Sequence, residues 1–203
     1  EVREVLKHGT LTVGFIGLAE TLKALIGVHH GESEKAQILG LQIVAHMRKA
    51  MDKATEKYNL NFSLIATPAE GLSGRFVKMD KKLFGELDGI TDREYYTNSF
   101  HIPVYYPISA FKKIKLEGPY HELTNGGHIS YVEMDGDPTK NIAAFEKIVR
   151  AMHDNGIGYG AINQLIVIQY VVIMELLMMF ARYVEEARKN IMVLNESGES
   201  LVI

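Results

Sequence analysis

The chain has no cysteine, no tryptophan, only five prolines and no large excess of charge of either sign. Without cysteine it can form no disulfide, no thiolate metal site and no cysteine nucleophile. Its 22 basic and 25 acidic side chains leave a formal net charge of −3, which argues against nucleic-acid binding through a basic surface. The chain begins at Glu1 without a signal-peptide pattern, so we expect a cytoplasmic piece of a longer protein.

Apolar residues make up 47% of the 203 residues, enough for a sizeable core. Residues 1–163 mix charged and apolar positions, whereas residues 164–180 carry Glu175 as their only charge. This run approaches the roughly 20 apolar residues that cross a bilayer. Gln169 and Glu175 would then lie in hydrocarbon at high cost, which argues against membrane insertion. We therefore predict a domain over 1–163 and an atypical apolar tail over 164–203.

Predicted strands and helices alternate along the chain. Ser33 suits the cap of a long helix, and the prolines and aromatic residues of 95–106 disfavour a helix there. Such alternation is typical of an α/β fold. The predicted elements are a strand leading into a helix at 10–26, a helix at 34–58, a strand at 62–66, an extended segment at 95–106, a strand at 129–134 and a helix at 138–153.

The clearest local signal for a ligand site follows the 62–66 strand. Thr67 suits the cap and Pro68 the first turn of a helix. A helix start presents free backbone N–H groups and the positive end of the helix dipole, which favour a phosphate or carboxylate. Arg75, one to two turns later, adds a charge-assisted contact in this interpretation. An ordinary strand-to-helix connection with a capping threonine explains the same residues.

Two other segments are candidates for a site, each with a structural alternative. Residues 95–101 concentrate hydrogen-bonding side chains, which line the site when they lie at strand ends of an α/β barrel. Cross-strand pairing with a turn explains them equally well. His29 and His30 invite a metal-site interpretation, but adjacent side chains point apart and no acidic residue has helical ligand spacing. We predict a structural role for both and no metal site.

Separate motifs, in the same order along the chain, resemble the anaerobic (class III) ribonucleoside-triphosphate reductases, which are glycyl-radical enzymes. The resemblance covers about residues 8–163. The motifs are His8–Thr10 with Gly14–Thr21, Thr67–Glu70 with Arg75–Phe76, Tyr95–His101, Asn125–Gly127 and Gly158–Asn163.

The resemblance implies the C-terminal part of a ten-stranded α/β barrel that reduces ribonucleoside triphosphates to deoxyribonucleotides. In that family a stored glycyl radical generates a thiyl radical, which abstracts the 3′-hydrogen of the substrate. The resemblance also implies a structural zinc, ATP and deoxyribonucleotide effectors, a homodimer and a radical-SAM activase. It assigns no catalytic residue here, and it assigns substrate binding to Thr67, Pro68, Ala69, Glu70, Gly71, Arg75, Thr97, Asn98, Ser99 and His101.

Residues 164–203 depart from the family pattern, which places a cysteine-ligated zinc site and the radical glycine, in an R-x-x-G-Y motif, in this region. A shifted reading frame that joins the last base of each codon to the first two of the next restores part of that pattern. It converts Met-Glu at 174–175 to Gly, Met-Met at 178–179 to Asp and Met-Phe at 179–180 to Val. We hypothesise that 164–203 is a frameshifted translation of the zinc and glycyl-radical domain. We expect this chain alone to be inactive.

Two other functions stay open at this point. One is a membrane-tethered α/β binding protein anchored by 164–183, against which the missing aromatic belt and flanking positive charge argue. The other is a glycyl-radical enzyme acting on a different small molecule. The motifs at 67–70 and 95–101 favour the reductase over this last alternative.

Overall fold

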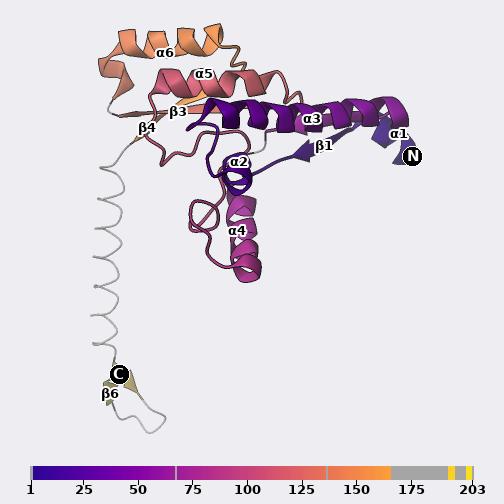
Figure 1. The fold of residues 1–203 in the computed structure, drawn as a ribbon. Helices are drawn as coiled ribbons and strands as arrows, with labels where there is room; N and C mark the ends of the chain where they lie inside the picture. Colours follow the sequence, from indigo (N-terminus) through magenta and orange to yellow (C-terminus); the bar gives the residue numbers. More distant parts are fainter. Residues whose placement is uncertain (1, 67, 136, 166–191, 195–199, 203) are drawn as a thin grey trace. The chain divides into compact units, whose positions relative to one another are not determined.

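The structure is a computed structural model that describes residues 2–66, 68–135, 137–165, 192–194 and 200–202 (Figure 1). The chain divides into two compact units, Glu1–Glu133 with Pro138–Asn163, and Met134–Asp137 with Gln164–Ile203. Most of the predicted tail lies outside the described residues. The frameshift hypothesis and the 164–183 anchor therefore stay predictions.

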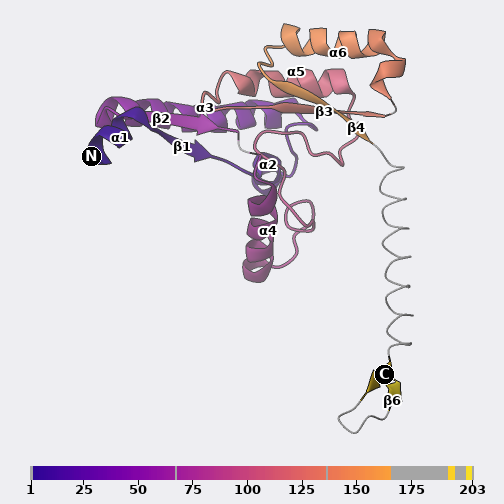
Figure 2. The same cartoon turned by 180° about the vertical axis from the view of Figure 1, so that it is seen from behind.

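Helices and strands follow one another along the described chain. The first half contains α1 (Val2–His8), β1 (Thr10–Gly14), α2 (Leu18–Ile26), α3 (Glu34–Tyr58), β2 (Asn61–Ile65) and α4 (Glu70–Phe84). The second half contains α5 (Ala110–His121), β3 (Ser130–Asp135), the 3-10 turn Pro138–Lys140, α6 (Ile142–Asp154), β4 (Gly160–Leu165), β5 (Met192–Leu194) and β6 (Ser200–Val202). In the first unit, α6 packs on α5 and α5 on α3, a succession that is visible from both sides (Figures 1 and 2).

The strands β1 and β2 form a parallel pair, with Thr10 opposite Asn61 and Gly14 opposite Ile65. Parallel strands need a long crossover, and α2 with α3 supplies it. α3 packs back on β2, so the predicted α/β alternation over this part of the chain is confirmed. β3 pairs with β4 and β5 with β6, and the described residues form no closed barrel of ten strands.

The core of the first unit joins α2, α3, β2 and α5 to the loop that precedes α5. Phe100 in this loop stacks on Tyr120 of α5, with ring centroids 5.2 Å apart. Gly40 of α3 admits the Tyr120 hydroxyl, since a Cβ at residue 40 would stand 2.5 Å from that oxygen. Tyr120 then donates a hydrogen bond to Gln37 at 3.1 Å, which ties α5 to α3. The buried core residues are Leu18, Leu22, Val44, Leu64, Ala66, Phe100 and Tyr120.

The prediction of an extended segment over 95–106 is wrong. Its strand-like pairing is limited to an isolated bridge between Asn98 and Ile16. The Thr97 carbonyl instead accepts a hydrogen bond from the Gly17 N–H at 2.8 Å, at the start of α2. A backbone carbonyl of this segment is therefore hydrogen-bonded to the start of a helix that lies about 80 residues earlier in the chain. Local propensity cannot reveal a partner at that distance.

The predicted start of the helix after β2 is also wrong. α4 begins at Glu70 with Ala69 as its N-cap residue, so Pro68 precedes the helix and does not occupy its first turn. The side chain of Ala69 makes no capping hydrogen bond. Thr67, the predicted cap, lies outside the described residues.

Candidate functional site

A buried carboxylate holds the loop 97–101 against the start of α2. Glu20 is 5% exposed and accepts hydrogen bonds from the Thr97 N–H at 3.0 Å and from the Thr97 hydroxyl at 2.7 Å. Ser99 has φ 41°, in the left-handed region, and its hydroxyl is buried. Thr97 and Ser99 thus shape the loop from inside the protein.

Asn98 joins this loop to the start of α4. Its Oδ1 accepts a hydrogen bond from the Ala69 N–H at 3.3 Å. The first turn of α4 is open on one side, because a Cβ built on Gly71 would meet no atom within 4 Å. Arg75, farther along the same helix, is exposed. The structure therefore brings two parts of the predicted site together and leaves the helix start accessible.

The other predicted contacts at this helix start are described only in part. Pro68 is exposed beside the start of α4. Glu70 begins the helix, but its side chain, like the whole of Thr67, lies outside what the structure describes. The site is therefore built here from Ala69, Gly71 and the neighbouring loop.

A cavity of about 130 Å³ opens beside this loop. The predicted residues Thr97, Asn98 and His101 line it. Side chains from α5 and β3 that the sequence did not single out also line the cavity, so polar groups of three segments face one small volume. They are Lys113, Tyr131 and Glu133, and Tyr95, Ile102, Val104 and Tyr105 complete the lining.

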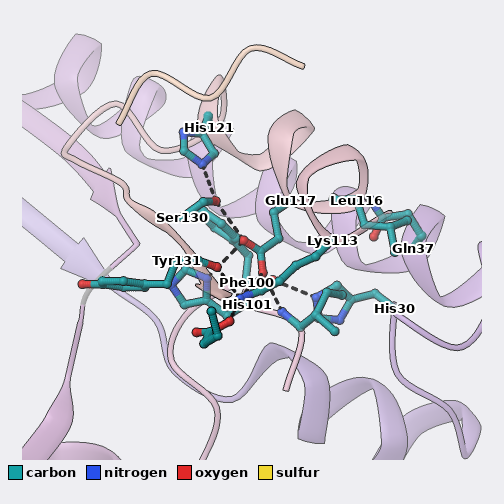
Figure 3. A network of polar contacts seen from close by, with 12 residues as sticks. His30, Gln37, Phe100, His101, Lys113, Leu116, Glu117, His121, Ser130 and Tyr131 are labelled. Atoms are coloured by element: carbon teal, nitrogen blue, oxygen red, sulfur yellow. Dashed lines mark hydrogen bonds and ion pairs between the residues drawn. The ribbon is translucent and has the colours of Figure 1, made fainter. Parts of the chain in front are cut away.

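Next to the cavity, the carboxylate of Glu117 is fully buried on α5 (Figure 3). It accepts hydrogen bonds from the Ile102 N–H at 3.0 Å and from the Ser130 hydroxyl at 2.8 Å. The Lys113 ammonium lies 3.9 Å from Oε1, and His101 Nδ1 lies 3.5 Å from Oε2. One carboxylate thus connects the site loop, α5 and β3.

The side chains around Glu117 keep it ionised. Burial by itself would raise the pKa of Glu117, but the His101 ring and the Lys113 ammonium outweigh burial and lower it. Lys113 also donates to the Tyr131 carbonyl and, at 3.1 Å, to Glu133. The cavity wall is therefore a network of paired charges.

Two buried histidines flank this network in their neutral form. The Gly158 N–H lies 3.3 Å from His121 Nδ1, and His121 Nε2 lies 3.0 Å from the Ser130 hydroxyl, an arrangement that leaves no room for a second ring proton. Burial and the nearby His128 lower the pKa of His121 to about 4. Burial likewise lowers the pKa of His30 to about 4, although the ring bonds the Phe100 carbonyl at 2.7 Å. That bond agrees with the predicted structural role of His30.

These histidines predict a stability that falls in mild acid. In the denatured chain each binds a proton near pH 6.5, whereas in the folded chain it does so near pH 4. Their contribution to the free energy of unfolding is therefore fully present above pH 6.5 and is lost as the pH falls toward 4. At pH 5 the loss is about 2 kcal/mol per histidine. Urea unfolding at pH 7.5 and 5.0 measures the difference. His121→Gln should reduce it, and the exposed His153→Gln should not; equal stability of the unmodified chain at both values would contradict the prediction.

Sequence reasoning missed the charged residues that build the site. Glu20 lies inside the Gly14–Thr21 motif, but no residue near it in the sequence indicates that its carboxylate accepts hydrogen bonds from Thr97. Lys113 and Glu117 are four residues apart on a helix, a spacing that is common on exposed helix faces. Only their contact with the loop before α5 shows that this pair is buried.

Comparison with known proteins identifies the same family that the sequence motifs resemble. The family model of the anaerobic ribonucleoside-triphosphate reductases matches residues 1–170. The chain is 41% identical over 136 residues to the anaerobic ribonucleoside-triphosphate reductase of Escherichia coli (strain K12), which covers 66% of this chain and 19% of that protein. It is 37% identical over 150 residues to the enzyme of Enterobacteria phage T4, covering 73% of this chain and 23% of that protein.

Solved structures show the same fold. An anaerobic ribonucleotide reductase aligns with TM-score 0.68 and 21% identity, over 79% of this chain and 25% of that one. The Thermotoga maritima enzyme with dATP bound in the specificity site aligns with TM-score 0.65 and 20% identity, over 78% and 26%. The chain spans about a fifth to a quarter of the curated relatives it matches.

Proposed function

Because this chain belongs to the anaerobic ribonucleoside-triphosphate reductase family, we propose that it forms a substrate-binding part of an enzyme that makes deoxyribonucleotides from ribonucleoside triphosphates. The family match over residues 1–170 carries this proposal. The same match argues against a membrane-tethered binding protein. Among the described residues, no helix has both the length and the apolar character that crossing a membrane requires.

The proposed place for the substrate's phosphates is the start of α4. Its N-cap residue, Ala69, has no side chain that could cap the first turn, and the helix dipole favours an anion there. Asn98 holds the Ala69 N–H, and Arg75 supplies a positive charge nearby. In this proposal Thr67, Pro68, Glu70 and Gly71 surround the phosphates, while Thr97, Ser99 and His101 orient the loop beside them.

The parent enzyme would supply the radical chemistry. The chain has no cysteine, so a thiyl radical and a cysteine-ligated zinc do not fit its own residues. The described residues also contain no group of three or more histidines, aspartates or glutamates arranged to hold a metal ion. We propose the ten-stranded barrel, nucleotide effectors, a homodimer, a radical-SAM activase and a cytoplasmic location for the parent enzyme, with β1 and β2 as two neighbouring barrel strands.

The site predicts that the chain binds a triphosphate group without the rest of the enzyme. Arg75→Ala should weaken the binding of both CTP and inorganic tripolyphosphate about tenfold, because one charge-assisted contact is lost. Asn98→Ala should weaken both about threefold or more, because the start of α4 loses its anchor. Isothermal titration calorimetry measures these affinities.

A matched control is Arg150→Ala, which removes an exposed arginine that pairs with Glu146 at 2.7 Å on α6. It should leave both affinities unchanged. If Arg75→Ala and the unmodified chain bind tripolyphosphate equally, the phosphate site is not at α4. The family assignment does not depend on that result.

A further inference from the structure

A second cavity, of about 380 Å³, lies between α2 and α4 and shares no lining residue with the first one. It contains two carboxyl groups, one on Glu20 of α2 and one on Asp80 of α4, together with the side chain of Tyr96. Its other walls include the apolar side chains of Leu25 and Phe76. No lysine, arginine or histidine lines it in the described part of the chain.

Only one of the two carboxylate oxygens of Glu20 accepts a hydrogen bond from the described residues. Its Oε1 accepts both hydrogen bonds from Thr97, whereas its Oε2 is buried and has no hydrogen-bond partner among the described residues. A buried carboxylate oxygen without a donor is unfavourable. The cavity therefore contains an acceptor that a ligand could satisfy.

The other polar groups of the cavity also offer mainly acceptors. The Tyr96 hydroxyl donates its hydrogen to Asp80 Oδ2 at 2.7 Å, so its oxygen keeps only lone pairs. Burial and this bond raise the pKa of Tyr96, which keeps the proton in place. Lys23, on the same helix as Glu20, lies 4.0 Å from Glu32. A suitable ligand must bring both hydrogen-bond donors and positive charge.

We propose that this cavity binds an aliphatic ammonium group. The ammonium donates to the carboxylates of Glu20 and Asp80, and the alkyl chain packs on Leu25 and Phe76, whose ring also attracts a cation. The cavity volume lies in the range of small-molecule sites and suits an α,ω-diamine. A free polyamine and a lysine side chain of another segment share this chemistry. The proposal does not rest on the reductase function.

The test is a titration of the 203-residue chain with 1,6-diaminohexane, followed by calorimetry. We expect saturable binding that Glu20→Gln and Asp80→Asn each weaken at least tenfold. The control Asp52→Asn, which alters an exposed carboxylate paired with Arg48 at 2.8 Å, should bind like the unmodified chain. 1,6-Hexanediol keeps the chain length but lacks the charge, so it should bind at least tenfold more weakly. The proposal is overturned if diamine binding is not saturable, or if the two cavity variants bind the diamine as tightly as the unmodified chain does.

A variant at an exposed position avoids any effect of Glu20→Gln on folding. Ala24 lines the cavity from the exposed face of α2, so Ala24→Lys places an ammonium inside it. Diamine binding should be lost and the melting temperature should rise; unchanged binding contradicts the site. Nα-acetyl-lysine amide, titrated in parallel, identifies the source. Tighter binding than the diamine assigns the site to a protein lysine, and weaker binding assigns it to a free polyamine.

Discussion

Glu117→Ala is expected to lower the free energy of unfolding by about 3–5 kcal/mol, the range for breaking a buried ion pair from one side. The substitution leaves the Ile102 N–H and the Ser130 hydroxyl without their acceptor. It also removes the charge that faces Lys113 and His101 (Figure 3). Urea unfolding at pH 7.5 measures the loss, and Glu117→Gln, which keeps the shape, provides a smaller change if the alanine variant does not fold.

The matched control is Glu146→Ala on α6. Glu146 and Arg150 have the same four-residue spacing as Lys113 and Glu117, and their charges meet at 2.7 Å, but both side chains are exposed. Exposed helix pairs contribute about 0.3–0.5 kcal/mol, so this variant should lose no more than that. A loss below 1 kcal/mol for Glu117→Ala would show that the buried network does not stabilise the fold. The double variant Lys113→Met with Glu117→Leu should recover part of the loss.

Gly118→Ala is expected to destabilise the protein by about 1–3 kcal/mol, the usual range for overpacking. In an ordinary helix interior this change would be stabilising, because alanine loses less conformational freedom than glycine. Here a Cβ on residue 118 would stand 2.2 Å from the backbone oxygen of Asn155, at the end of α6. A backbone atom cannot rotate away, so α5 and α6 must separate.

Gly71→Ala is the control for this prediction. Residue 71 is also in a helix, and a Cβ there would meet nothing within 4 Å. It should therefore stabilise the nucleotide-free chain by up to about 1 kcal/mol, as helix propensity predicts. Thermal unfolding of the two variants side by side measures the contrast. A stabilised Gly118→Ala variant would show that α5 and α6 do not pack as described.

Where the sequence succeeded, the signal was local. The apolar spacing over 34–58 predicted α3, because helical periodicity depends only on residues three and four apart. The prediction failed over 95–106 because the Thr97 carbonyl bonds the Gly17 N–H, a partner far away in the chain. Part of the candidate site was predictable: Asn98 and Ala69 belong to two separate motifs, and the structure joins them at 3.3 Å.

By itself the sequence determined the family, through motifs in a recognisable order, and it determined the α/β alternation and the lack of any cysteine chemistry. Each of these features depends on the identity and order of the residues, and none depends on which surfaces pack together. Only the tertiary structure decided that Glu20 bonds Thr97, 77 positions later, and that Glu117 is buried while Glu146 is not. Burial and long-range hydrogen bonds depend on which surfaces pack together. The sequence places each of these carboxylates four residues from a basic residue, and only the fold shows that one pair is buried and the other exposed.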